Sequence, residues 1–103
     1  MAITVHLEDM NHQRLRSFED DESVSLRAIG DRAKAVRSGM LTAVHPHSDG
    51  MLNVPQLNIL IDELDELLKV PDLTEGEREM CVELAGAAYE TLRRLGFLFF
   101  EGD

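Results

Sequence analysis

The chain has 103 residues, a length that suits one domain with one hydrophobic core. Hydrophobic residues make up 44% of it, which excludes general disorder, and no apolar run reaches the roughly 18–20 residues needed to span a bilayer. The formal net charge of −10 opposes binding to the phosphate backbone of nucleic acids. We therefore expect a small globular protein that binds neither nucleic acids nor membranes.

The N-terminal segment and the cysteine content predict a cytoplasmic location. Residues 1–9 show no basic segment followed by an apolar run, which is the pattern of a secretory signal. Cys81 is the single cysteine, so an internal disulfide cannot form and a reducing compartment is the natural expectation.

The first quarter of the chain predicts two strands. Apolar and polar residues alternate over residues 3–8, which is typical of a half-buried strand. Residues 13–18 are expected to return as a second strand, with Leu15 or Phe18 facing the core. The acidic run at residues 19–22 is expected to form an exposed connection.

A helix is expected over residues 23–39, although Gly30 weakens its interior and the first residues also alternate like a strand. One side of it is basic, which suits either pairing with an acidic neighbour or binding of an anionic ligand (Arg27, Arg32, Lys34, Arg37). A strand over residues 40–44, a turn over residues 45–50 and a returning strand at residues 51–52 follow.

The clearest pattern lies at residues 53–69. Apolar residues recur there at steps of three and four, which predicts a helix with one apolar stripe and one acidic face (Leu57, Leu60, Ile61, Leu64, Leu67, Leu68). Asn53 and Gln56 form a capping box, and Pro55 fits the first turn, where its missing N–H is not needed. Pro71 stops the helix.

A second long helix is expected from Thr74, which forms a capping box with Glu77, to Gly96. Its apolar stripe is defined by residues three or four apart (Met80, Cys81, Leu84, Ala88, Leu92, Leu95). The small residues 85–88 allow a neighbouring element to approach closely. The apolar run at residues 97–100 predicts a strand inside the sheet, and Tyr89 is expected in the core.

Together these elements predict an α+β fold formed by a single domain over residues 1–103. We expect a small, mainly antiparallel sheet packed against two or three helices, with the C-terminal strand in the sheet. A short sheet has exposed edges, so a homodimer that pairs two edges across a two-fold axis is also expected as a possibility of the fold.

Residues 41–68 and the C-terminus resemble a family of small, uncharacterised bacterial proteins. In that family a strand runs into an Asp-Pro-Tyr-Gly-Asp-Thr turn, an Asn-x-x-Gln helix start leads an acidic helix, and an aromatic strand closes in Gly-Asp. The matching residues here are few and dispersed (Pro46, Asp49, Asn53, Gln56, Gly102, Asp103). The resemblance implies an α+β fold with a C-terminal strand and brings no activity with it.

The turn at residues 45–50 is a candidate metal site. A His-x-His pair after a strand can aim two imidazoles at one ion, so His45 and His47, with Asp49 as an oxygen ligand, suggest a metal-binding or hydrolytic protein. Pro46 and the Ser-Asp-Gly sequence are also ordinary turn residues, which favours the simpler interpretation of a turn. We expect no cofactor and no other catalytic group.

The acidic face of the helix at residues 53–69 is the preferred candidate site. Asp62, Asp65 and Glu66 lie toward the negative end of its macrodipole, where carboxylates are unfavourable, and Lys69 is expected to compensate Asp65 alone. Residues 41–103 hold thirteen acidic and four basic side chains, against seven and six in residues 1–40. The sequence therefore favours a non-catalytic interaction module for a basic protein, such as an inhibitor or immunity-type partner of a cationic toxin.

Overall fold

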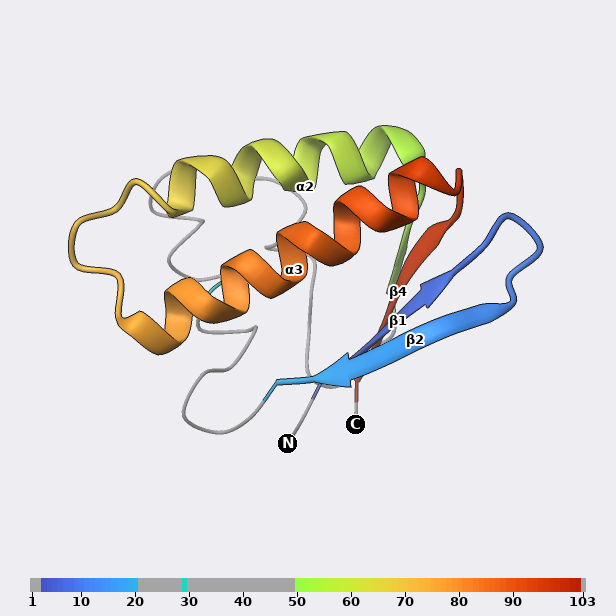
Figure 1. Cartoon of the computed structure of the whole chain (residues 1–103), viewed down its shortest axis with the longest axis horizontal. Coiled ribbons are helices and arrows are strands. Elements are labelled where there is room, and N and C mark those ends of the chain that lie inside the picture. Colours follow the sequence, from blue (N-terminus) through green and yellow to red (C-terminus); the bar gives the residue numbers. More distant parts are fainter. Residues whose placement is uncertain (1–2, 21–28, 30–49, 103) are drawn as a thin grey trace.

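The computed structural model describes residues 3–20, 29 and 50–102 (Figure 1). These residues form an α+β domain in which helices α2 and α3 pack on an antiparallel sheet of strand order β2-β1-β4-β3. The elements are β1 (Thr4–Glu8), β2 (Arg14–Glu19), β3 (Gly50–Leu52), α2 (Val54–Leu67), α3 (Glu75–Arg93) and β4 (Phe97–Glu101). The predicted fold class is confirmed, including the C-terminal strand inside the sheet.

Some of the predicted secondary-structure elements lie outside the described residues. The predicted strand at residues 40–44 and the turn at 45–49 belong there, as does the predicted helix at 23–39 apart from Ile29. Ile29 itself has a helical backbone and is fully buried in the core.

The register of the sheet places one set of side chains toward the helices. Val5 of β1 lies opposite Phe18 of β2 and Phe100 of β4, and Leu7 lies opposite Leu98. Because side chains alternate along a strand, His6 and Phe99 point to the other face. One of Leu15 and Phe18 was expected to face the core. Phe18 does so and packs against it, whereas Leu15 is 39% exposed.

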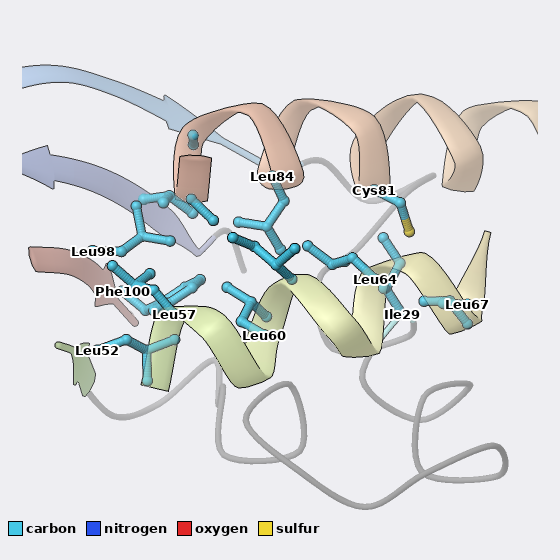
Figure 2. Close-up of a cluster of buried hydrophobic side chains, with 14 of the residues drawn as sticks. Ile29, Leu52, Leu57, Leu60, Leu64, Leu67, Cys81, Leu84, Leu98 and Phe100 are labelled. Atoms are coloured by element: carbon cyan, nitrogen blue, oxygen red, sulfur yellow. The ribbon is translucent and has the colours of Figure 1, made fainter. Parts of the chain in front are cut away.

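The core lies between the sheet and the two helices (Figure 2). It is almost wholly aliphatic, as the scarcity of aromatic residues predicts. In Figure 2 the leucines of α2 point toward α3, and the Sγ of Cys81 points from α3 toward α2. The largest contributors are fully buried (Ile3, Leu7, Ile29, Leu57, Leu60, Leu64, Leu67, Leu84, Leu98).

Both helices begin as their sequences predict. The side chain of Asn53 accepts a hydrogen bond from the Gln56 N–H, and the Gln56 side chain accepts one from the Asn53 N–H. Thr74 and Glu77 make the same reciprocal pair at the start of α3. These caps satisfy N–H groups that have no partner within a helix, so they define the first residue of each helix.

The end of α3 differs from the prediction. Leu95, expected on the apolar stripe, is 59% exposed and has a φ of 53°, in the left-handed region. The Leu95 N–H donates to the carbonyl of Leu92, and the Gly96 N–H donates to that of Thr91. This is a Schellman motif in which Leu95 holds the position that glycine usually takes.

Replacing Leu95 with glycine is therefore expected to stabilise the protein. A left-handed conformation costs an L-residue roughly 1–2 kcal/mol, and glycine avoids most of that cost, so a net gain of about 1 kcal/mol is expected in the free energy of unfolding. Urea denaturation of L95G measures it. Leu95→Ala is the matched control, because alanine keeps the Cβ; an equal gain in L95A would contradict the explanation.

Three details of packing correct the sequence analysis. Asp20, expected in an exposed connection, is 5% exposed, and its Oδ1 accepts a hydrogen bond of 2.7 Å from the Ile3 N–H. Tyr89, expected in the core, is 52% exposed. In the run of small residues, Ala87 and Ala88 are buried, whereas Gly86 faces open space.

Candidate functional site

The predicted acidic face of α2 is exposed in the structure. Asp62, Asp65 and Glu66 all lie on the solvent side of the C-terminal half of α2. Glu66 pairs with Lys69 at 3.6 Å, so the expected pairing of Lys69 with Asp65 is wrong. Lys69 is 72% exposed at its side chain, and an ion pair this open contributes little to stability.

The same end of the helical layer carries further carboxylates. Figure 1 shows α2 and α3 side by side and antiparallel, so the end of α2 lies beside the start of α3. Exposed carboxylates come from the C-terminal half of α2, the connection and the N-terminal half of α3, and we call this set the acidic surface (Asp62, Asp65, Glu66, Asp72, Glu75, Glu79, Glu83). Lys69 and Arg78 are the exposed basic residues between positions 62 and 83.

Arg78 also has a structural contact. Its Nη1 donates a hydrogen bond of 2.9 Å to the carbonyl oxygen of Leu68, the residue that caps the C-terminus of α2. A cation at a helix C-terminus is favoured by the helix dipole. Arg78 therefore ties the end of α2 to α3, and this contact fixes the two parts of the acidic surface relative to each other.

A shallow hollow of about 410 Å³ lies on the outer side of α3 within the acidic surface. Its lining includes Val82 and four charged residues (Glu75, Arg78, Glu79, Glu83). Val82 is 57% exposed and provides an apolar patch between carboxylates. Such a combination suits a lysine or arginine side chain, whose apolar stem packs on carbon while its charged head remains among anions.

One buried carboxylate of α2 was missed by the sequence analysis. Glu63 is 2% exposed, although it neighbours the exposed Asp62 in the chain. The signal is present in the sequence, because Glu63 lies three residues after Leu60 and four before Leu67, and so falls on the apolar stripe. A buried carboxylate needs polar partners, and Glu63 takes part in polar interactions in the structure.

The alternative metal site, formed by His45, His47 and Asp49, lies outside the described residues. Within the described ranges, no group of three or more histidine, cysteine, aspartate or glutamate side chains is arranged to hold a metal ion. The four basic residues predicted on the helix at 23–39 also lie outside those ranges. The metal site therefore stays a prediction.

A hydrogen-bonded cluster on the face of the sheet opposite α2 and α3 was not foreseen. His6 is 6% exposed; its Nδ1 lies 2.6 Å from Ser17 Oγ and its Nε2 lies 3.2 Å from Glu101 Oε1. The ring of Phe99 stacks beside it, at 6.0 Å between ring centroids. The order of hydroxyl, imidazole and carboxylate is also that of a hydrolase triad. Here the three side chains come from adjacent strands, and we interpret them as cross-strand contacts that stabilise the sheet.

Cys81 fits the structural role predicted for it. Its side chain is buried, and burial together with the nearby Glu77 carboxylate raises the pKa of the thiol to about 11, although Arg78 opposes the shift. The thiol therefore stays protonated at neutral pH. Because the thiolate is the reactive form, Cys81 is a poor nucleophile in the folded protein.

Comparison of the chain with protein-family models, curated proteins and solved structures gives no match. The resemblance to the bacterial family therefore rests on the residues quoted above and stays a prediction. Among the described residues, neither helix combines the length and the apolar character needed to cross a bilayer.

Proposed function

We propose that this protein is a non-catalytic interaction module that binds a basic protein through the acidic surface. The observation that supports this proposal is the charge of the exposed helical layer. Seven exposed carboxylates lie between positions 62 and 83, against Lys69 and Arg78 (Asp62, Asp65, Glu66, Asp72, Glu75, Glu79, Glu83). Of the two cations, Lys69 pairs with Glu66 and Arg78 bonds the end of α2.

This arrangement is unfavourable for the isolated protein. Like charges at helical spacing repel, as in the series Glu75, Glu79 and Glu83, and Asp65 and Glu66 oppose the dipole of α2. A basic partner would relieve both effects. Complementary charge would also accelerate association, and salt would weaken it because exposed charges are screened.

The hollow around Val82 adds specificity to the proposal. A partner side chain that reaches it would be long and cationic, with its stem on Val82 and its head near Glu79 or Glu83. Inhibition of a cationic toxin or enzyme is one biological form of such binding, in a reducing cytoplasm. The acidic surface lies away from the sheet edges, so self-association through an edge is compatible with it.

Charge reversal tests the proposal. The immobilised chain is incubated with lysate of the source cell, and bound proteins are identified by mass spectrometry. The expected result is a basic partner that is released by salt. The triple variant D62K/D65K/E66K is expected to capture at least about tenfold less of this partner, because each contact becomes repulsive.

The matched control is the triple variant E19K/E90K/E101K, which changes the net charge by the same amount on other parts of the protein. It is expected to retain the partner, and thermal midpoints check that both variants are folded. Equal capture by D62K/D65K/E66K and the original chain would exclude the acidic surface as the binding site.

A further inference from the structure

β2 lies at one edge of the described sheet. It pairs with β1 on one side, and no described strand lies on its other side (Figure 1). Five of its six residues are exposed, and Phe18 is intermediate. An edge of this length presents backbone N–H and C=O groups that are ready to pair with another strand.

The other edge of the described sheet is a weaker candidate. β3 is described over three residues, Gly50–Leu52, so β2 with six residues is the longer described edge. In β2 the register is irregular only at the hairpin end, where it shifts between Leu7 and Glu8. Arg16 to Glu19 are paired regularly with Leu7 to Thr4, so this part of β2 keeps the geometry that strand addition requires.

The charges of β2 are arranged by direction. The strand begins with Arg14 and Arg16 and ends with Glu19, which Asp20 follows. A second copy of the strand in antiparallel orientation brings its acidic end to the basic end of the first. A parallel copy would place like charges together. β2 is therefore complementary to itself in the antiparallel orientation alone.

The alternation of side chains also limits the register. Directly opposite residues of an antiparallel pair share a face, so the two-fold axis must pass through a residue. An axis at Arg16 sets two arginines against each other, and an axis at Phe18 shortens the overlap. An axis at Ser17 avoids both and sets Arg16 opposite Phe18 of the second copy.

We propose that two copies of this chain dimerise through β2, antiparallel and centred on Ser17, to form one continuous sheet. In this pairing Arg16 contacts the Phe18 ring of the second copy, as its guanidinium already lies 5.9 Å from the centre of its own Phe18 ring. Leu15 lies opposite Glu19 of the second copy, and Arg14 lies opposite its Asp20. The interface is isologous, so each contact occurs twice.

Sedimentation equilibrium of the full chain over a range of concentrations tests the dimer. R14E is expected to weaken it about tenfold, because the new carboxylate at position 14 would lie opposite Asp20 of the second copy in both halves of the pairing. The control R93E makes the same charge change as R14E on α3 and is expected to have no effect.

A cross-link tests the register. Ser17→Cys is expected to give a covalent dimer on mild oxidation, because the two thiols face each other across the axis. Leu15→Cys is the control, since its two copies lie four residues apart on either side of the axis; Cys81 is buried in both variants. Circular dichroism checks the fold of each variant.

A chain that stays monomeric at every concentration, with no more cross-linking in S17C than in L15C, would overturn the dimer. Because β2 and the acidic surface are separate, this outcome would leave the proposed binding of a basic protein untouched. Unchanged capture by D62K/D65K/E66K, which would exclude the acidic surface as a binding site, likewise says nothing against the dimer.

Discussion

Replacement of Gly96 by alanine is expected to destabilise the protein by about 3 kcal/mol, through overpacking against backbone that cannot easily move. A Cβ at Gly96 would overlap the carbonyl oxygen of Glu8 and would lie 3.0 Å from the Cα of Asp9. Glu8 is held on both sides, since it pairs with Phe97 of β4 and Arg14 of β2. Relief of the overlap therefore requires the end of the sheet to open.

Gly86 provides the control for this prediction. It lies inside α3, and a Cβ added there meets nothing within 4 Å. Gly86→Ala is expected to raise the free energy of unfolding by roughly 0.5–1 kcal/mol, because alanine is the better helix former. Urea denaturation of both variants makes the comparison. Similar effects of G96A and G86A would show that contact with Glu8 does not explain the glycine.

Leu64→Ala is expected to cost about 3 kcal/mol, within the range of roughly 2–5 kcal/mol found for leucine in a close-packed core. Leu64 is fully buried and lies between α2 and α3 in Figure 2. Alanine would leave a cavity there, and the rigid helices on both sides restrict its collapse. Since small domains are stable by about 5–15 kcal/mol, the loss is a large fraction of the whole.

Ile59→Ala is the matched control on the same helix. Ile59 is 39% exposed, so truncation removes fewer contacts and leaves no enclosed cavity; a cost below about 1 kcal/mol is expected. Thermal or urea denaturation followed by circular dichroism measures both. Equal losses in L64A and I59A would contradict the placement of the core between the two helices.

The helices were predictable because their signals are local. Period, caps and stop residues all lie within a few positions of one another, as at Asn53 with Gln56 and at Thr74 with Glu77. The sheet was predictable in kind, since alternation marks a strand wherever its partner lies. The order β2-β1-β4-β3 was not, because it depends on contacts between residues far apart in the chain.

The errors have the same origin. Asp20 looks like a loop residue until the Ile3 N–H, seventeen positions away, gives its carboxylate a partner. Leu95 fits the helical period, but the tight approach of Gly96 to Glu8 ends the helix one turn earlier. In both cases a tertiary contact overrides a correct local pattern.

The candidate site was predictable in part. The exposure of Asp62, Asp65 and Glu66 follows from the helical period alone. The adjoining carboxylates of α3 join them only through the antiparallel packing of the two helices, which the sequence does not specify. The contact of His6 with Ser17 and Glu101 joins three strands, and no residue spacing in the sequence predicts it.

The central position of β4 affects how the protein can form during synthesis. β1 is made first, yet its neighbour β4 begins at Phe97, which pairs with Glu8 from 89 residues earlier in the chain. A nascent chain can form the β1–β2 hairpin early. The edge of β1 that pairs with β4 then stays exposed until residues 97–101 have been synthesised. Such distant pairing slows folding, and the waiting edge is the point at which premature aggregation on the ribosome is most to be expected.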